Sequence, residues 1–530
     1  MRRPPRFGSV PVSGTPAGNP PVRPRAGRPP VRLLAAATGV ALTAATLAGC
    51  APPDRAGGGS SGTLRIAAST DAGESLNPYA SNQSPTQELR SALLYEGLTH
   101  LSPTGRLEWR LATEMTPNAD LTVWTIKLRP GVTFSDGSDF TSADVVASIK
   151  YLRDPEHAVQ GLALIEMIDP DEVEAVDRLT VRVGLSRPFG PFKDVWANVF
   201  LPMTKAGTAP AKPIGTGPFA VRSFTAGRQS SLKRFDGYWG AKPKLEAVEI
   251  IEYQSQQAQA NALLSDQVDV ASGATPAIAK SLGGKDGVEL LDSKGDFTLR
   301  IGLNTTVAPF DDVRVRQALR LLIDRREVVS NAFGGYARVA SDHEAGTPQC
   351  PAPDVPQRQQ DIGQAKKLLA EAGQSDLSFS IATDGLLPGM QEMAQVFSEN
   401  AAKAGVKVDV NVITPQEFLS KWGKWPVYVD FNTLPYLPYV ITSLLPRRVA
   451  NATHWDDREF GRLAEELFAA PESRQCPIMN RMHKIEYEQG PMITPAFVNV
   501  LLPYRSRVRG LVTDVSGRPL SFLSNVTVGK

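Results

Sequence analysis

Histidine and cysteine are scarce in this sequence. Its 530 residues include only 5 histidines and 3 cysteines. The histidines are scattered, and no H-E-x-x-H motif is present. Metal-dependent and nucleophilic hydrolysis both need clustered ligands or an activated nucleophile. We therefore predict no catalytic residue, no metal site and no cofactor, and a secreted hydrolase is the weakest of the functions that we consider.

Long apolar runs are also rare. The stretch from Leu33 to Ala48 is rich in alanine and leucine, but it is shorter than the roughly 20 residues of a membrane-spanning helix. No later segment is both long and uncharged, so we predict no permanent transmembrane helix. The remaining composition, 42% hydrophobic and 21% charged, is typical of a folded soluble protein with two or three lobes.

Acidic residues are absent from the first 49 positions, which carry seven arginines. Removing this segment would change the net charge from +2 to −5. The mildly basic character of the chain therefore comes from its N-terminus alone, and a nucleic-acid partner has no electrostatic support.

An arginine-rich lead, an apolar run and small residues follow one another before Cys50. This order is typical of a secretory signal, which we assign to residues 1–49. The segment Leu47-Ala48-Gly49-Cys50 resembles the lipobox of bacterial lipoproteins, in which the cysteine receives a lipid and becomes the new N-terminus. The alternative is a soluble signal peptide with a chance cysteine. Residues 50–62, rich in glycine, serine and proline, then form a flexible tether, and the protein lies at the outer face of the cell membrane.

The two other cysteines suit an exported protein. Outside the cell an even pair is more often bonded than free, so Cys350 and Cys476 are predicted to form a disulfide. Two unpaired buried thiols are the alternative.

Hydrophobic periodicity predicts a mixed α/β fold. Residues 64–68 form an apolar strand, residues 86–95 a helix, and residues 121–128 a strand with alternating apolar side chains. Thr141 and Asp144 have the spacing of a helix-capping box. We expect one helix across residues 310–335, begun by aspartates and stopped by two glycines.

A strand, a helix and a second strand are predicted between residues 377 and 412. Such a βαβ unit requires its two strands to be parallel. No internal repeat follows residue 62, so the α/β pattern continues through the body of the chain.

Three longer motifs occur in order. They are TVWTIKLRPGVTFSDGSDFTSADVVASIKYL at residues 122–152, PIGTGPF at 213–219 followed by RFDGYWGAKPKL at 234–245, and GLNTT with PFDDVR at 302–314. Each has a plain structural explanation in turns, close backbone approach and core filling. A nucleotide-binding interpretation of Gly215-Thr216-Gly217 fails because Ala220 stands where the third glycine would be.

Together these motifs resemble the signatures of the family 5 extracellular solute-binding proteins, the oligopeptide-, dipeptide- and nickel-binding components of bacterial ABC importers. The resemblance implies a two-lobed periplasmic-binding-protein-like clamp, type II, with an additional inserted α/β domain. On this analogy lobe I comprises residues 63–96, 206–343 and 496–530, the inserted domain 97–205, and lobe II 344–495. Closure about a hinge would bury a peptide or peptide-like molecule, which an ABC permease then receives from a monomeric protein.

Peptide binders of the family hold the ligand's ammonium with an aspartate in a segment that aligns here with residues 433–438. Leu434 and Leu437 stand at the aspartate positions. A buried, unpaired ammonium is costly, so a blocked or cyclic peptide, or another amphipathic metabolite, fits as well as a free-amine peptide unless Asp430 supplies the charge. A nickel or haem role lacks a clustered ligand set.

Aromatic side chains are dense between residues 422 and 439, and such side chains suit a ligand cleft. We select candidate ligand-binding residues from this cluster, from the polar loop of the first lobe and from beside His454: Tyr436, Asn82, Gln83, Trp425, Tyr439 and Trp455. A sensor that reports the ligand to a receptor is the other role open to this fold.

The lipobox generates the first prediction. Replacing Cys50 by alanine should abolish acylation and signal processing, because the sulfur that accepts the lipid is lost. Labelling with radioactive palmitate, together with fractionation of cells expressing either chain, measures this. Palmitate label on the Cys50→Ala chain, or its processing and membrane retention at the native level, would show that the cysteine is not the anchor.

Overall fold

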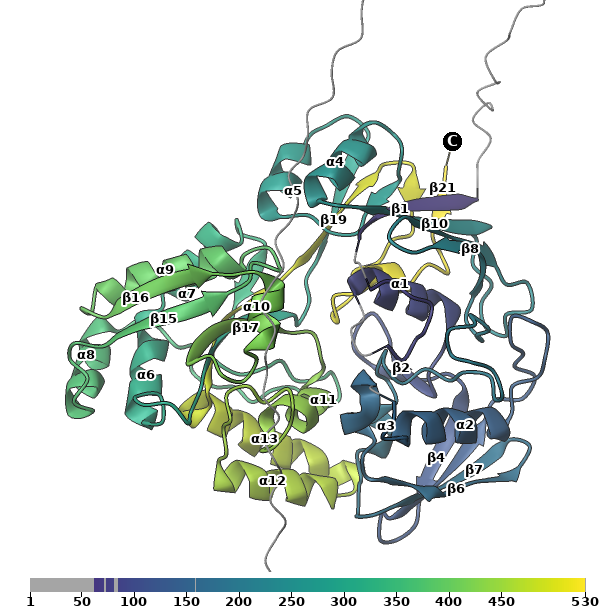
Figure 1. Ribbon diagram of the computed structural model, residues 1–530, viewed down its shortest axis with the longest axis horizontal. Helices are drawn as coiled ribbons and strands as arrows, with labels where there is room; N and C mark the ends of the chain where they lie inside the picture. The colour runs from purple at the N-terminus through teal and green to yellow at the C-terminus, as the bar shows by residue number, and fades with distance from the viewer. Residues whose placement is uncertain (1–61, 71–72, 81–83, 158, 530) are drawn as a thin grey trace, which may run out of the picture. The chain divides into compact units, whose positions relative to one another are not determined.

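The computed structural model describes residues 62–70, 73–80, 84–157 and 159–529. The predicted signal peptide, Cys50, nearly all of the tether and the candidates Asn82 and Gln83 lie outside these residues. The described residues form one compact unit. Within the described residues, no helix combines the length and apolar character that crossing a membrane requires. The structure confirms the mixed α/β class (Figure 1).

A seven-stranded sheet organises the first lobe. Its strands, in spatial order, are β12 (Val288–Ser293), β19 (Val500–Arg505), β11 (Val270–Ala271), β1 (Thr63–Ser69), β10 (Ala247–Tyr253), β9 (Gln229–Arg234) and β8 (Phe219–Thr225). The helices that belong to this part are α1 (Pro85–Leu94), α4 (Gln256–Leu264) and α5 (Pro276–Leu282). A hairpin-like pair in the C-terminal tail joins β20 (Val508–Arg509) to β21 (Thr527–Val528).

A four-stranded sheet forms the inserted part. Its spatial order is β4 (Ala112–Pro117), β5 (Val123–Leu128), β7 (Thr180–Leu185) and β6 (Ile168–Asp177), all antiparallel. Two helices, α2 (Ser142–Arg153) and α3 (Phe192–Val195), accompany it. Before this sheet, β2 (Thr99–Leu101) pairs with β3 (Leu107–Trp109).

A six-stranded sheet organises the second lobe. Its order is β14 (Ala337–Val339), β18 (Met492–Val498), β13 (Thr298–Leu303), β17 (Val427–Asn432), β15 (Ser378–Thr383) and β16 (Lys407–Val412). The helices of this part are α6 (Val313–Leu322), α7 (Arg325–Glu327), α8 (Ile362–Glu371), α9 (Met390–Ala402), α10 (Pro415–Ser420), α11 (Tyr436–Tyr439), α12 (Arg458–Phe468) and α13 (Glu472–Gln489). The predicted βαβ unit is confirmed, since β15 and β16 are parallel and α9 connects them.

The sheets correct the predicted division of the chain. We expected residues 206–343 to lie wholly in lobe I, but β13, α6 and β14 belong to the sheet and core of the second lobe. Residues 492–495 likewise continue through β18 to Val498. The sequence could not show this, because the residues of a strand do not reveal which of two sheets the strand joins. The other domain bounds stay predictions.

Several local predictions are confirmed. Strands β1 and β5 and helix α1 lie where periodicity placed them. The backbone N–H of Thr141 donates to Asp144 Oδ2 at 2.8 Å, as in a capping box, and Gly131 ends the turn after β5 with φ +74°. The single helix expected across 310–335 is wrong: α6 is capped by Asp312, ends at Leu322, and is followed by a second start at α7.

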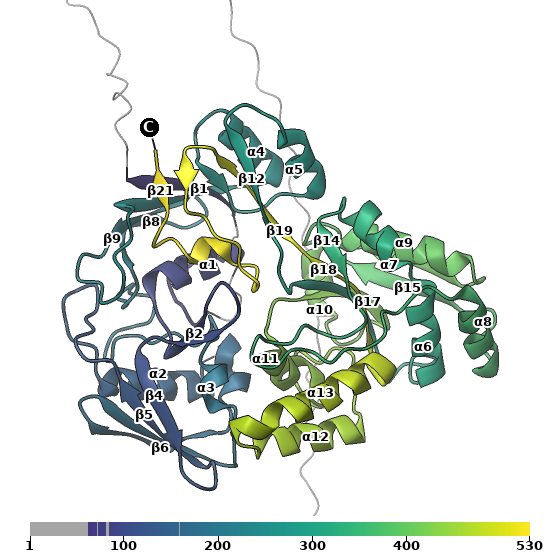
Figure 2. The same ribbon diagram turned by 180° about the vertical axis from the view of Figure 1, so that it is seen from behind.

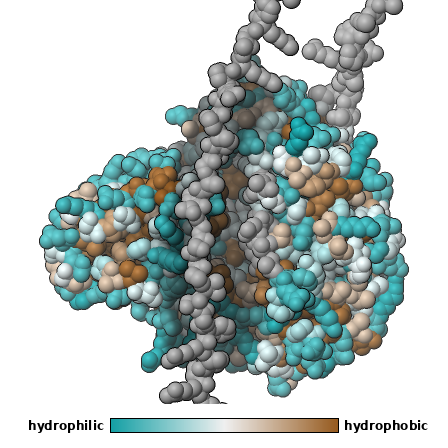
Figure 3. Space-filling view, viewed as in Figure 1, coloured by the Kyte–Doolittle hydropathy of each residue, from teal (hydrophilic) through white to brown (hydrophobic). Residues whose placement is uncertain are grey.

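The inserted part shares its hydrophobic core with helices of the second lobe. Buried side chains of β5, β7 and α3 form one cluster with those of α11, α12 and α13. The rings of Phe189 and Phe468 lie 5.2 Å apart, and the N–H of Gly190 donates to the Phe468 carbonyl at 2.6 Å. Ion pairs border this contact, including Arg187 with Glu465 at 3.3 Å. Figure 2 shows α12 and α13 beside the insert from behind, and Figure 3 shows that hydrophilic residues predominate on the face drawn there, interrupted by smaller hydrophobic areas.

The PIGTGPF motif crosses the C-terminal end of α1. A Cβ added to Gly215 would lie 2.0 Å from the Leu94 carbonyl oxygen, and one on Gly217 would lie 2.8 Å from it. The N–H of Gly217 donates to the same oxygen at 3.0 Å. These two glycines therefore serve close backbone approach, as the sequence predicted.

Substituting Gly215 by alanine should lower the free energy of unfolding by about 1–3 kcal/mol or more, because the backbone must move to admit a methyl group. Gly461→Ala is the matched control: Gly461 lies inside α12, and no neighbouring atom comes within 4 Å of its added Cβ. That change should be neutral or stabilising by up to about 1 kcal/mol. Urea unfolding measures both, and equal effects would contradict the steric explanation.

Candidate ligand-binding site

A cavity of about 400 Å³ lies where the first lobe, the insert and the second lobe meet. The end of α1, the β2–β3 pair, the loop after α3 and the C-terminal tail form most of its wall. Leu434 and Pro435 contribute from the second lobe. We call it the junction cavity. Its volume lies in the range of small-molecule sites, and a ligand there would touch all three parts at once.

Arg518 ties the tail to both lobes beside the cavity. Its Nε donates to Glu88 Oε2 on α1 at 3.0 Å, and one terminal nitrogen lies 3.5 Å from Thr433 Oγ1 in the second lobe. Its backbone N–H donates to Asp514 Oδ2 at 2.6 Å. The Arg518 side chain is 22% exposed and lines the cavity, so its guanidinium can still donate to a guest there.

Glu96 follows α1 and is the buried acid of the cavity wall. Tyr238 Oη donates to one carboxylate oxygen at 2.7 Å, Trp239 Nε1 donates to the other at 2.6 Å, and Arg110 forms an ion pair with it. Burial raises the pKa of Glu96, and these partners oppose that rise. The Tyr-Trp-Gly segment of the sequence therefore does more than fill a core, since it holds this carboxylate in place.

Burial also acts on His100, which lines the same cavity. It lowers the pKa of His100 to about 3, with a further contribution from the charge of Arg110. His100 is therefore neutral at physiological pH and can offer one donor and one acceptor.

Leu434 and Pro435, the two second-lobe residues in the cavity lining, follow β17, whose last residues form a network of buried charges. Asp430 accepts from Arg300 at 2.8 Å, and Arg300 also donates to Glu344 at 3.1 Å. Asn432 Nδ2 donates to Glu344 at 3.0 Å. Asp430 remains 12% exposed, but its charge is already paired. The segment after it, with Leu434, adds no carboxylate to the wall.

Tyr436 lies behind this wall in a buried polar cluster. Its hydroxyl donates to Glu486 Oε1 at 2.6 Å, and its ring stacks on His483 with centroids 3.7 Å apart. Burial raises the pKa of Glu486 to about 8, while the hydrogen bond from Tyr436 opposes the rise. Burial and the nearby His343 lower the pKa of His483 to about 3. Both groups are therefore mainly uncharged near neutral pH.

Three of the predicted ligand-binding residues are buried in a hydrophobic core. Tyr436, Tyr439 and Trp455 are 2%, 1% and 4% exposed and belong to the core shared with the insert. Tyr439 faces Arg300, whose guanidinium carbon lies 4.5 Å from the ring centroid. Their roles as ligand contacts stay predictions. Sequence reasoning missed Arg518 and Glu96, because an arginine in the tail and a glutamate after a helix carry no local signal of a cavity.

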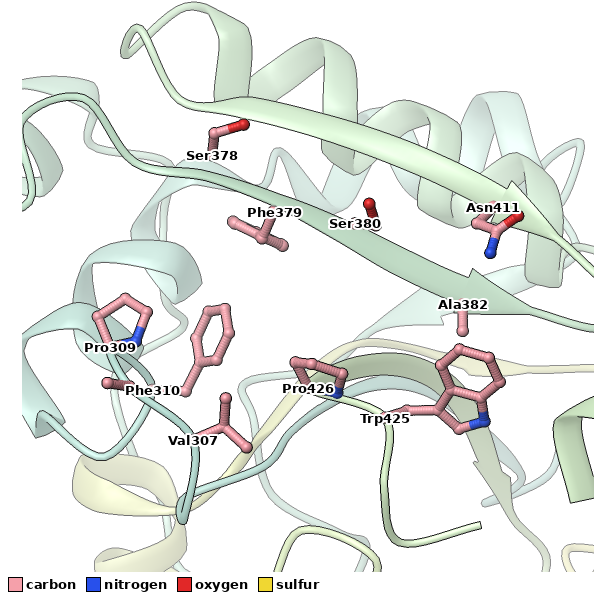
Figure 4. Close-up of a pocket in the computed structure, with 11 residues that line it drawn as sticks. Val307, Pro309, Phe310, Ser378, Phe379, Ser380, Ala382, Asn411, Trp425 and Pro426 are labelled. Carbon is pink, nitrogen blue, oxygen red and sulfur yellow. The ribbon is translucent and has the colours of Figure 1, made fainter. Parts of the chain in front are cut away.

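Trp425 lines a second pocket of about 340 Å³ within the second lobe (Figure 4). Phe310 and Pro309 lie on one side of this pocket, and Ala382 and Asn411 lie on the strands β15 and β16. All of its wall comes from one lobe, so lobe closure would not enclose a guest there. The junction cavity is the better candidate for the main site.

The two remaining cysteines are free thiols in this structure. They are nevertheless neighbours: burial raises the pKa of the Cys350 thiol, and its hydrogen bond and charge interaction with Cys476 raise it further. Cys476 Sγ donates to the Gln349 carbonyl at 3.4 Å. The predicted disulfide stays a prediction. Within the described residues, no group of three potential metal ligands comes together.

Glu486 generates a prediction on pH dependence. Its folded pKa of about 8 exceeds the unfolded value of roughly 4.3. The neutral form therefore contributes stability that is complete below about pH 4 and is lost as the pH rises through 8. In the Glu486→Gln chain this loss, up to about 1.4 kcal/mol per pH unit, should disappear. The measurement is urea unfolding from pH 5 to 8 of both chains.

Comparing the two chains cancels the opposite contribution of His483. Glu488→Gln removes an exposed glutamate from the same helix and serves as the control. Parallel stability curves for the native and Glu486→Gln chains would contradict a buried, neutral carboxyl.

Comparison with known proteins agrees with this architecture. The model of the bacterial extracellular solute-binding proteins, family 5 Middle, matches residues 106–438. The glutathione-binding protein GsiB of Pectobacterium atrosepticum is 30% identical over 350 residues, which cover 64% of this chain and 67% of that protein. GsiB of Escherichia coli strain K12 is 28% identical over 353 residues, with the same coverage.

Solved structures show the same fold at lower identity. The ABC transporter substrate-binding protein CtaP of Listeria monocytogenes aligns with a TM-score of 0.77 and 22% identity, covering 89% of this chain and 100% of that one. NikZ of Campylobacter jejuni, solved in complex with Ni(L-His), gives a TM-score of 0.76 and 20% identity, covering 88% and 99%. The predicted clamp fold is confirmed. Since the family model matches more than half of the sequence, this chain belongs to the family 5 bacterial extracellular solute-binding proteins.

Proposed function

We propose that this protein captures a peptide or peptide-like small molecule outside the cell membrane and delivers it to an ABC import permease. Membership of the solute-binding family supports capture and delivery. The relatives named above support the ligand class, since they are glutathione-binding proteins. The lipid anchor at Cys50 and the monomeric state are part of the same proposal.

The junction cavity is the observation that carries this proposal. Its wall combines Tyr95 and Arg518 of the first lobe, Asn198 of the insert, and Leu434 of the second lobe. A ligand that contacts all three parts stabilises the arrangement of the lobes and insert that brings these residues together. A permease can distinguish this ligand-bound arrangement from that of the ligand-free protein. Binding then reports occupancy without chemical change to the guest.

The wall chemistry narrows the ligand class. Leu434 and Pro435 present apolar surface, and Asp430 is already paired with Arg300. A free ammonium placed against Leu434 and Pro435 would lose water without gaining a carboxylate partner from the second lobe. We therefore favour a blocked or cyclic peptide, or another amphipathic metabolite. Contacts from Tyr436, Asn82, Gln83, Trp425, Tyr439 and Trp455 are proposed on the sequence pattern.

A disulfide between Cys350 and Cys476 is proposed for the exported protein. Cys350 follows a tight turn in which its N–H donates to the Thr347 carbonyl at 3.0 Å, and Cys476 lies in the first turns of α13. The bond would fix this loop to the helix, and an oxidising compartment favours it.

Native mass spectrometry of the purified chain tests the ligand class, because tight solute receptors often retain cargo. We expect a bound mass below about 1 kDa that belongs to a molecule without a free α-amine. The isolated cargo, returned to emptied protein in a calorimeter, should rebind with one molecule per chain.

Leu434→Asp is the matched variant for this test. It places a carboxylate on the wall, so the affinity for a free-amine dipeptide such as Ala-Phe should rise by about tenfold or more relative to its N-acetyl form. A linear free-amine peptide as the retained cargo of the native chain would overturn the ligand class. Chemical turnover of the cargo would overturn the proposed function itself.

A further inference from the structure

Exposed hydrophobic side chains gather around α10 of the second lobe. Val412 precedes this helix, Leu419 lies within it, and Val449 belongs to a later loop; these side chains are 49%, 65% and 92% exposed. Trp422 Nε1 donates to the Val449 carbonyl at 3.0 Å, so the loop lies against the end of the helix. We call this surface the α10 rim and define it by residues 412, 419–425 and 447–449. It is distinct from the junction cavity.

A packed aromatic cluster supports the rim from below. Phe418 is buried, and its ring lies 5.8 Å from that of Trp422 and 6.3 Å from that of Trp425. Tyr428 of β17 and Ile413 complete the cluster. The exposed side chains therefore lie above a packed core, so their positions are fixed before any partner binds.

Basic side chains neighbour these apolar ones along the chain. Lys421, Lys424 and Arg447 are all exposed, whereas Glu417 is the one acid of α10. Glu417 pairs with Lys421 at 2.9 Å. Among the described residues, no ion pair is formed by Lys424 or Arg447, so the rim keeps an excess of positive charge. The neighbouring Arg448 points to the insert, where it pairs with Glu166.

We propose that the α10 rim is a contact surface for an anionic phospholipid bilayer. Tryptophan prefers the boundary between headgroups and acyl chains. Exposed aliphatic side chains enter that boundary, and lysine and arginine are attracted to the negative surface potential. The rim combines these three features on one preformed surface, whereas a protein partner would need a complementary acidic and apolar surface. The contact is independent of the ligand and would orient the second lobe against the membrane.

Fluorescence quenching by brominated lipid tests this contact on the full chain. The protein has 7 tryptophans, so the emission of Trp422 is taken as the difference between the native and Trp422→Phe chains. Vesicles of brominated phosphatidylglycerol with phosphatidylcholine should quench most of this emission at low salt. Brominated phosphatidylcholine alone should quench little of it, and about 1 M salt should abolish the effect of the anionic lipid.

Paired variants separate the rim from other routes to the vesicle. In the chain with Leu419→Ser and Val449→Ser, half-maximal quenching of Trp422 should need about ten times more anionic lipid, because the apolar contact is removed. Val176→Ser with Leu264→Ser is the control, since these side chains are 58% and 43% exposed outside the rim. All chains carry the same N-terminus, so any contribution that it makes to vesicle binding is the same in each.

Two results would overturn the proposal. One is Trp422 emission that anionic and neutral vesicles quench equally or not at all. The other is a loss of Trp422 quenching by anionic vesicles that is equal in the rim variant and in the control variant. Photo-crosslinking from position 449 to a protein in whole membranes, without quenching by lipid, would assign the rim to a protein partner instead. Cargo binding by the rim variant is measured in parallel. If it is unchanged, a failure of the membrane contact leaves the proposed ligand-binding function intact.

Discussion

The close approach of two glycines to the end of α1 sets where this protein can form its site. Gly215 and Gly217 leave room for the Leu94 carbonyl, which accepts the N–H of Gly217. This contact joins the segment that returns from the insert to the helix that precedes it. Tyr95 and Glu96, which follow Leu94 directly, are thereby placed on the wall of the junction cavity. Any side chain larger than hydrogen would separate the two segments and displace that wall.

Buried charges near the cavity are paired within each part of the protein. On the first lobe and insert, Glu96 is held by Arg110, Tyr238 and Trp239. On the second lobe, Asp430 and Glu344 share Arg300. Both arrangements satisfy buried charges internally, as the cost of desolvation requires. The charged contacts left for a guest are therefore those of Arg518 and of Glu108 on β3, beside neutral side chains.

The insert contributes more than a wall. Its core is continuous with α11, α12 and α13, and the Phe189–Phe468 contact lies within this shared region. A hinge motion that separated the second lobe from the insert would expose that apolar surface to water. The same constraint explains why Tyr436 and Tyr439, predicted as ligand contacts from their density in the sequence, are buried here. Aromatic density alone does not distinguish a cleft from a core.

The sequence by itself determined the fold class, the family, the strands and helices with strong periodicity, and the roles of Gly131, Asp312 and Gly215, because each depends on local backbone geometry or on neighbours along the chain. It misjudged the helix over 310–335 and the lobe to which β13 and α6 belong. Only the tertiary structure decided these, together with the junction cavity, the pairing of Asp430 with Arg300 and the α10 rim. Each of them joins residues far apart in the chain, where pairing and burial depend on how whole sheets pack.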